Sequence, residues 1–473
     1  MLAARPSPQR SPLRRSKRGC VRTVAATESR TAPRVVVIGA GPSGLLAAAL
    51  LLEHKDCRVD VYEARSDPRT VPLGTGRQFA VGLGARGREA ISSLPARYWE
   101  SVERRGVRAD AFYVHLNEKL RLNLRKGASK DGEGSLLINR TAICCALLDE
   151  LVSGVESPTH GSVSCHFDAP ATSVDLERRE VTFAGVEAPV QYDLLIGADG
   201  AGSIVRGAMV AAKEAPVTIT ADEPVSGAWK VLHAPLPPSF EGAVHAMQSP
   251  AYGFGLFVIP APNGRSCSLV SWRDGTAEPP ALAGASPDAV ADAIEAAFPA
   301  FGRPPVEACE DLVKQRVSSA RVVCCRPYHH SPGRAVLLGD AAHCTGGTLG
   351  QGANSSLLDA KAMVSIMGEC DWDLDRFCPA FSADRVPEGE ALLRLLRLGQ
   401  GGAKETPAWR RAVFAAGTLA STLLSRVLPS YFKPVIQTQL STGTDRFVDI
   451  ARDNAFWLDF MGVAASDAET EAQ

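Results

Sequence analysis

A glycine-rich turn near the start of the chain has the residue types and spacing that bind a dinucleotide. Gly39, Gly41 and Gly44 form a G-x-G-x-x-G pattern directly after a β-branched run. In such a turn the first glycine permits the sharp bend, the second lets the backbone approach a pyrophosphate, and the third lets helix and strand pack closely. Ser43 lies where the N-terminus of the next helix would face the phosphates. A plain glycine turn is the alternative.

A carboxylate further along the chain argues against that alternative. Glu63 lies 24 residues after Gly39, at the end of the next apolar run. In this place a carboxylate accepts hydrogen bonds from both ribose hydroxyls, whereas a 2′-phosphate calls for a basic residue. The pair of features therefore indicates FAD or NAD at this turn rather than NADP.

Two later motifs each place an aspartate after an apolar run and next to a glycine. They are Asp199-Gly200 and Gly339-Asp340. One such aspartate is most often a turn residue, but two at strand ends, far apart in the chain, favour a shared ligand. Asp340 is expected to bind a ribitol hydroxyl, and the helix that follows would stabilise negative charge on a reduced flavin. The amides at the start of that helix belong to Gly350, Gly352, Ala353 and Asn354.

No side chain is predicted to be catalytic and none to bind a metal. His343 follows the third motif, where it is expected to support the turn rather than transfer protons. The 12 cysteines include no C-x-x-C pair, so a metal site is disfavoured. They are expected to be buried small residues of a reduced compartment.

The elements that must position these motifs alternate between strand, glycine turn and helix. Residues 35–38 and 57–62 are expected strands on either side of a helix that runs through Leu52, which makes one βαβ unit. From about residue 215, prolines and short alternating runs predict antiparallel sheet, and Ser286-Pro287 predicts a helix start. The predicted fold is α/β: a doubly wound parallel sheet that binds FAD, an inserted antiparallel substrate domain and a C-terminal helical region.

Length and composition set the boundaries. The chain has 473 residues, 45% of them hydrophobic, and a net charge of −1, which suggests two or three domains and gives no indication of nucleic-acid binding. No apolar stretch is long enough to span a membrane; residues 412–425 are expected to be an amphipathic or buried helix. The predicted segments are 1–33 as a transit peptide or disordered, 34–214 as the first part of the FAD-binding domain with interleaved substrate-domain strands, 215–325 as the substrate-domain sheet, 326–390 as the second part of the FAD-binding domain, 391–461 as C-terminal helices and 462–473 as a disordered tail.

The first 33 residues are rich in arginine and serine, and Glu28 is their only acidic residue. Without an apolar core this is not a secretory signal, and the pattern is typical of a transit peptide. A disordered basic tail is the alternative. Prolines and the small residues 24–26 favour a plastid destination over a mitochondrion.

The three motifs, in this order, resemble the single-component FAD monooxygenases of the para-hydroxybenzoate hydroxylase type. The likeness is greatest to kynurenine 3-monooxygenases and covers most of residues 34–455. It implies FAD contacts at Glu63, Arg65, Arg140, Asp340 and Asn354. It further implies that NADPH binds without a Rossmann domain of its own, and that a flavin C4a-hydroperoxide transfers oxygen to an electron-rich substrate carbon. Because the cofactor performs the chemistry, the protein mainly positions the substrate and excludes water.

The chain departs from that family at the substrate. The arginine that clamps the substrate carboxylate in the kynurenine enzymes matches Phe112 or Tyr113 here, and the asparagine and tyrosine match Gly399 and Ile436. A proline of the loop over the flavin matches Gly347. We therefore expect hydroxylation or epoxidation of a small aromatic or hydrophobic substrate with O2 and NADPH or NADH. A flavoprotein reductase on the same fold and a non-catalytic FAD-binding redox sensor are the alternatives. Arg121, Arg125 and Arg397 are the candidates to replace the missing arginine.

Overall fold

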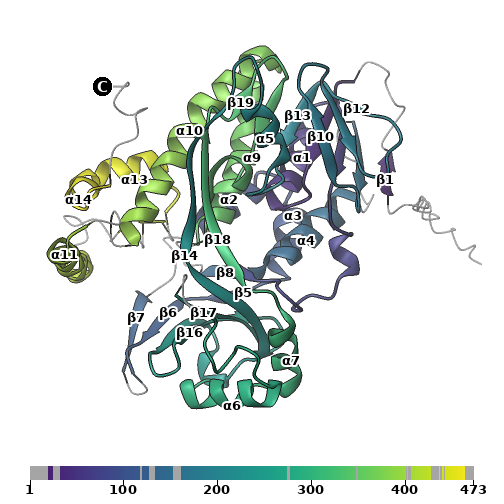
Figure 1. The fold of residues 1–473 in the computed structure, drawn as a ribbon. Helices are drawn as coiled ribbons and strands as arrows, with labels where there is room; N and C mark the ends of the chain where they lie inside the picture. Colours follow the sequence, from purple (N-terminus) through teal and green to yellow (C-terminus); the bar gives the residue numbers. More distant parts are fainter. Residues whose placement is uncertain are drawn as a thin grey trace, which may run out of the picture.

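The computed structural model describes residues 20–24, 32–117, 120–126, 134–152, 161–273, 277–347, 350–400, 402, 406–427, 436, 439–440 and 443–463 (Figure 1). Two large sheets dominate these residues, one mostly parallel and one mostly antiparallel. Helices cover both faces of the first, and a separate helical group follows at the C-terminal end of the chain. This is the predicted α/β architecture.

The parallel sheet has seven strands in the order β1-β9-β3-β2-β13-β20-β19. Its central strands are short β-branched runs that are buried on both faces, as parallel strands covered by helices must be. The edge strands β1 and β19 pair antiparallel with their neighbours. The bounds are β1 Cys20–Val24, β2 Arg34–Ile38, β3 Arg58–Tyr62, β9 Ser162–His166, β13 Leu194–Gly197, β19 His329–His330 and β20 Ala335–Leu337.

The helices against this sheet begin where the glycine turns end. Helix α1 starts with Pro42, which is favoured at the first helical position because its missing N–H has no partner there in any case. Residues 42–52 of α1 are all buried, between the sheet and helices α4 and α9. The helices of this layer are α1 Pro42–His54, α4 Arg140–Val152, α5 Ile204–Val210, α8 Asp340–His343 and α9 Gly352–Glu369.

Two small antiparallel sheets and three short helices complete the FAD-binding part. One small sheet, β4-β8-β5, lies next to the second large sheet and packs apolar side chains against it. The elements are η1 Pro68–Thr70, β4 Ala80–Leu83, α2 Ala85–Ile91, α3 Ala96–Glu103, β5 Val107–Ala109, β8 Ser135–Asn139, β10 Ala171–Asp175, β11 Glu180–Phe183 and β12 Val190–Gln191.

The second large sheet has eight strands in the order β21-β18-β14-β17-β16-β15-β6-β7. Neighbours pair antiparallel except β15 and β6, which are parallel. Strands β6 and β7 come from the earlier segment, so this domain is interleaved with the first, as expected. The bounds are β6 Ala111–His115, β7 Arg121–Lys126, β14 Thr218–Pro235, β15 Ala243–Ser249, β16 Phe254–Ala261, β17 Arg265–Trp272, β18 Ser318–Arg326 and β21 Cys344–Thr345.

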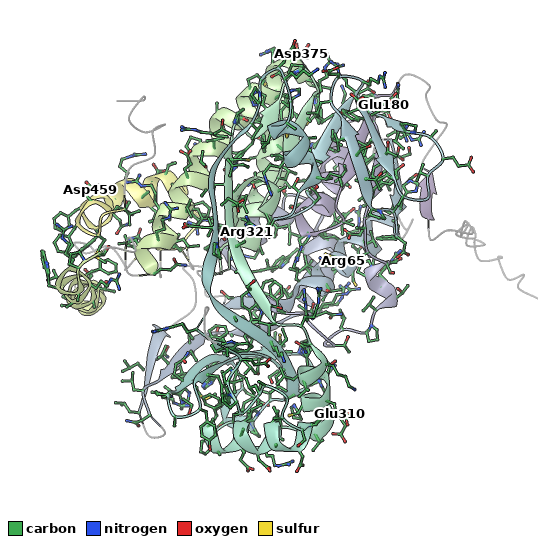
Figure 2. All side chains as sticks on the ribbon, in the orientation of Figure 1. Arg65, Glu180, Glu310, Arg321, Asp375 and Asp459 are labelled. Atoms are coloured by element: carbon green, nitrogen blue, oxygen red, sulfur yellow. The ribbon has the colours of Figure 1, made fainter. Side chains whose placement is uncertain are left out.

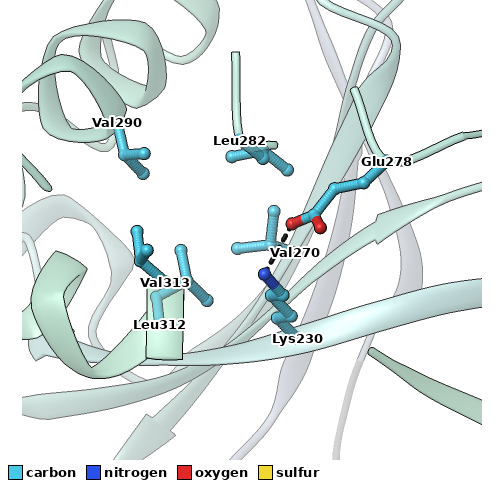
Figure 3. Close-up of a pocket in the computed structure, with 7 residues that line it drawn as sticks. All are labelled: Lys230, Val270, Glu278, Leu282, Val290, Leu312 and Val313. Carbon is cyan, nitrogen blue, oxygen red and sulfur yellow. Dashed lines mark ion pairs between the residues drawn. The ribbon is translucent and has the colours of Figure 1, made fainter. Parts of the chain in front are cut away.

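One face of this sheet is covered by helices α6 (Pro287–Ala297) and α7 (Val306–Lys314), with the short η2 (Pro238–Phe240) beside it (Figure 1). The predicted cap is present, because the Ser286 hydroxyl accepts from the Ala289 amide at 3.2 Å. Figure 3 shows the hollow between this face and the helices, where Lys230 and Glu278 form an ion pair at 2.6 Å among apolar side chains. This hollow lies far from the glycine turns in the fold, and its charged pair is a structural one.

The C-terminal helices begin earlier than the sequence suggested. Helix α10 runs from Leu374 to Gly399, across the expected boundary at residue 390, with Pro379 and Pro387 inside it. The described side chains of helix α11 (Ala408–Val427) are exposed or half-buried, which agrees with the amphipathic alternative and not with the buried one. The last two helices are α13 Phe447–Asp453 and α14 Ala455–Phe460. Among the described residues, no helix has the length and apolar character that crossing a membrane requires.

Most of the segment predicted to be a transit peptide lies outside the described residues, as do residues 464–473 of the predicted tail. Residues 20–24 and 32–33 are described, and residues 20–24 form β1, which pairs with β9 at the edge of the parallel sheet. Targeting therefore stays a prediction, and removal of the whole segment would also remove this edge strand.

Candidate flavin site

The first glycine turn connects β2 to α1 and contacts the second motif directly. Gly39 has a φ of +105°, and a Cβ there would lie 2.3 Å from the Ala198 carbonyl oxygen. A Cβ on Gly44 would lie 2.1 Å from the carbonyl oxygen of Gly39. Both positions therefore require glycine, for the tight bend and for close helix–strand contact.

Gly41 is open on the side that a pyrophosphate would approach. A Cβ built on Gly41 would meet only the Arg140 guanidinium, at 3.6 Å. Arg140 is the first residue of α4, directly after β8. Ser43 is buried in the first turn of α1, and its hydroxyl lies 3.5 Å from the place of a Cβ on Gly339. The fold thus brings Gly41, Ser43, Arg140 and the third motif together, with amides and one cation suited to a diphosphate.

Glu63 folds back onto the turn from the end of β3. Its carboxylate accepts from the Ala40 amide at 2.9 Å and from the Arg65 amide at 3.0 Å, one bond to each oxygen. Each oxygen retains a second lone-pair site, so both ribose hydroxyls can still be bound. The Arg65 side chain is exposed, and Figure 2 shows it on the surface of the FAD-binding part.

Asp199 lies in the second turn, between Ala198 and Gly200. One carboxylate oxygen caps helix α5 by accepting from the Ile204 amide at 2.7 Å. The other oxygen is buried and has no hydrogen-bond partner among the described residues. Burial raises the pKa of this carboxyl. An unpartnered acceptor beside the Gly39 turn is what a ligand hydroxyl or amide would satisfy, so these residues fit FAD.

The third turn presents Asp340 to the start of α9. Gly339 has a φ of +57°, and a Cβ there would lie 2.5 Å from Cβ of Ser356, so only glycine fits. The Asp340 carboxylate lies 3.9 Å from the place of a Cβ on Gly352, the first residue of α9. The amides of Gly352 and Ala353 thus begin the helix beside this aspartate, as predicted, and Gly350 (φ +66°) turns the chain into it.

Asn354 has a structural task that the sequence did not reveal. Its side-chain oxygen accepts from the amides of Gly84 and Gly87, and its amide group donates to the carbonyls of Gly82 and Gly350. All of these partners are backbone groups, so the side chain joins the β4–α2 turn to the start of α9. Its predicted contact with FAD remains a prediction, while the part that the structure assigns is to shape the turn.

His343 is buried and does not face the turns. Its Nε2 lies 2.5 Å from the Asp359 carboxylate, which agrees with the expectation that it supports the turn. Asp359 was missed because it lies 16 residues away in the sequence; its one signal is an acidic residue in the middle of a largely apolar helix. Among the described residues, no three His, Cys, Asp or Glu side chains are grouped as metal ligands would be.

One face of the antiparallel sheet is apolar and lies on the side of these turns; we call it the inner face. Val231, Ile259 and Cys267 on this face pack against β4, β5 and β8. Gly82 of β4 contacts Asn354, and Arg140 follows β8, so this is the side of the sheet that carries the cofactor turns. Phe112 lies edge-on to Phe257, with ring centroids 5.8 Å apart. The other half-buried side chains of the face are Trp229, Val244 and Leu269.

Comparisons with known proteins agree with this site. A model of the FAD binding domain matches residues 154–370, and one of the NAD(P)-binding Rossmann-like domain matches residues 37–89. Kynurenine 3-monooxygenase of Salinispora arenicola is 28% identical over 425 residues, 86% of this chain and 87% of the relative. That of Stenotrophomonas maltophilia is 29% identical over 369 residues, covering 76% and 77%.

Solved structures show the same fold. P. aeruginosa PqsL in complex with 2-aminobenzoylacetate superposes with a TM-score of 0.60 at 19% identity, over 78% of this chain and 95% of that one. The tetrameric form of 2-methyl-3-hydroxypyridine-5-carboxylic acid oxygenase gives 0.59 at 17%, covering 77% and 90%. The chain is an FAD-dependent monooxygenase, similar in sequence and in fold to the single-component aromatic monooxygenases. The cofactor of this monooxygenase is FAD and its co-substrate is NADPH.

The structure distinguishes Phe112 from Tyr113, the two residues that match the clamp arginine of the kynurenine enzymes. Phe112 lies on the inner face with Phe257, whereas Tyr113 lies on the opposite face, next to His245 at 5.3 Å. Arg121 stacks on Tyr113 at 4.5 Å, away from the inner face, and Arg397 pairs with Glu223 at 2.9 Å. Register places Arg125 opposite Phe112, but its side chain lies outside the described residues.

The loop after His343 joins the two domains of the monooxygenase. Cys344–Thr345 form β21, which pairs with β18 of the antiparallel sheet. Gly346 approaches Val225 closely, since a Cβ there would lie 2.4 Å from its Cγ2. Gly347 has a φ of +79°, which proline cannot adopt because its ring fixes φ near −65°. The proline of the related sequences would therefore force a different loop here.

Proposed function

We propose that this monooxygenase hydroxylates or epoxidises a small aromatic or hydrophobic substrate that has no carboxylate. The apolar inner face of the antiparallel sheet carries the proposal. Bound FAD supplies the chemistry, because it accepts a hydride from NADPH and activates O2. Phe112, one of the two residues that match the clamp arginine, lies on this face with Phe257, whereas Arg121 stacks on Tyr113 of the opposite face and Arg397 is paired with Glu223.

The residues of this face act by orienting the substrate and excluding water. Phe112 and Phe257 meet edge to face and offer ring surfaces for an aromatic substrate. Burying about 150 Å² of apolar substrate surface would contribute roughly 4 kcal/mol before the cost of association. A carboxylate among these side chains would lose its hydration without a partner, which costs several kcal/mol.

Matched substrate pairs test the proposal directly. We would load the full chain with FAD and follow NADPH oxidation, O2 uptake and oxygenated product. The panel pairs each carboxylated aromatic with its uncharged counterpart, such as a hydroxybenzoate with a phenol and an aminobenzoate with an aniline. We expect the uncharged member of each pair to give the higher kcat/KM and more product per NADPH.

Three outcomes would contradict it. Preference for the carboxylated members would mean that a cation reaches the inner face. A reduced product formed without O2 would favour a reductase. NADPH oxidation that no substrate stimulates would favour the alternative of a non-catalytic redox sensor.

We also propose a plastid location, which the Arg- and Ser-rich start of the chain supports. A fluorescent protein fused after residue 33 should enter plastids. Uptake by mitochondria alone, or retention in the cytosol, would contradict this.

A further inference from the structure

A buried network of charges connects the third glycine turn to the long helix α10. Asp359 of α9 lies between the imidazole of His343 on one side and the guanidinium of Arg385 of α10 on the other. Nε2 of His343 lies 2.5 Å from one carboxylate oxygen, while Nε and Nη2 of Arg385 lie 2.9 and 2.8 Å from the other. Their side chains are 1–7% exposed, so these contacts form where water does not compete.

The same carboxylate also holds the backbone of the turn. The Gly339 amide donates to Asp359 at 3.0 Å, on the oxygen that contacts His343. Asp340, the predicted ribitol ligand, lies between Gly339 and His343 in the chain. The Asp359 side chain therefore fixes Gly339, which precedes Asp340, and His343, which ends the short helix α8.

Helix α10 packs tightly against one side of this network. A Cβ on Gly389 would lie 2.1 Å from the Tyr328 hydroxyl and 3.1 Å from Cβ of His343, so the helix backbone lies directly against both side chains. Further along, Arg397 pairs with Glu223 of β14 at 2.9 Å. The helix thus extends from the third turn to the antiparallel sheet (Figure 1).

Both charged groups beside Asp359 favour its ionised form. Burial opposes ionisation, but His343 and Arg385 outweigh it and hold the pKa of Asp359 below its ordinary range. Burial would also lower the pKa of His343, yet the neighbouring carboxylate raises it. A buried charge held in this way keeps its partners in one geometry, because an unpaired charge at this depth is costly.

We propose that Asp359 is a positioning residue for the flavin. Its side chain fixes the Gly339–Asp340 turn to which FAD binds, and through Arg385 it makes FAD affinity depend on the position of helix α10. The inference rests on FAD binding and not on the identity of the substrate. Asp359 itself does not touch the reacting atoms. Its loss should change cofactor affinity more than it changes the stability of the apoprotein.

The experiment compares Asp359→Asn with wild type and with Asp375→Asn. Asp375 forms an exposed ion pair with Arg334 at the start of the same helix, at the top of Figure 2. We would measure FAD Kd from flavin fluorescence, the visible flavin spectrum, and Tm of the apo and FAD-loaded full chain. We expect the FAD Kd of Asp359→Asn to rise about tenfold or more, since a lost buried charged hydrogen bond costs about 1–3 kcal/mol. Asp375→Asn should change Kd less than about twofold.

Two further variants keep the test decisive if Asp359→Asn does not fold. His343→Gln retains an amide N–H toward Asp359 and Arg385→Lys retains the charge, so both should show an intermediate rise in Kd. Equal FAD Kd in these variants and wild type, with only a lower apo Tm, would overturn the positioning role while leaving the proposed function intact. A wild-type chain that bound no FAD would overturn both.

Discussion

At the glycine turns several polar side chains are bonded to backbone, whereas the inner face of the antiparallel sheet is held by apolar contact. Glu63, Asn354 and Asp359 each accept from at least one main-chain amide near the flavin turns. On the sheet, Phe112, Phe257 and Trp229 fill the equivalent place with rings. Hydrogen bonds have preferred directions, so they fix the geometry that the cofactor needs. An apolar face can accept a different ligand when the volumes of its side chains change. The first region should therefore tolerate substitution far less than the second.

The largest effect is expected at the first turn. Gly44→Val places a side chain where a Cβ would already lie 2.1 Å from the Gly39 carbonyl oxygen. Separating α1 from β2 should cost roughly 3 kcal/mol or more and abolish FAD retention. Flavin content after purification and circular dichroism report the two effects. Gly207→Ala, in a helix position with nothing within 4 Å of a Cβ, is the control and should keep its flavin.

Asn354→Ala should have the next largest effect. It removes the partners of two amides and two carbonyls, and leaving buried backbone groups unpaired should cost roughly 3 kcal/mol. We expect a lower Tm and weaker FAD binding. Ser355→Ala is the matched control, because Ser355 is equally buried and its hydroxyl has no partner among the described residues. Similar losses in the two variants would contradict the bridging role of Asn354.

Acid should weaken the parallel-sheet domain first. Asp60 of β3 is fully buried; burial opposes its ionisation, but His166, Arg34 and Arg58 outweigh it and lower the pKa of this carboxyl. A group with a lowered folded-state pKa contributes stability above its unfolded value of about 4, and this stability is lost as pH falls through the folded value. Unfolding followed from pH 6 to 3 should therefore be less steep in Asp60→Asn. An unchanged slope would mean that Asp60 is not the group that titrates.

The smallest effect on stability, and the sharpest on selectivity, is expected at Phe112. Phe112→Arg adds a cation to the inner face on the half-buried strand β6, next to the edge strand β7, so Tm should fall by only a few degrees. The kcat/KM for an aromatic carboxylate should rise about tenfold relative to its uncharged counterpart, as one charged hydrogen bond would give. Leu120→Arg, outside the strand and half exposed, controls for added charge alone. Equal selectivity in the two variants would show that the substrate binds elsewhere.

The sequence predicted the glycine turns, the two strands that precede Glu63 and the Ser286 cap well, because each depends on residues close together in the chain. It could not predict the pair of His343 with Asp359 or the four bonds of Asn354, since these are chosen by packing between distant segments. The C-terminal helices were expected from residue 391, whereas α10 begins at Leu374 and continues through Pro379 and Pro387. Helix context overrode a local signal there.

The interleaving of the two domains has a consequence for how the protein is made. Strand β13, which pairs with β2, acquires its other neighbour β20 only after residue 335, and Asp359 acquires Arg385 later still. Contacts so distant in sequence form slowly, because long loops must close first. A ribosome that releases the chain in order has finished most of it before the flavin turns are complete. Insertion of the cofactor is therefore among the last events of biogenesis, and a truncated chain that ends before α10 should accumulate without its yellow colour.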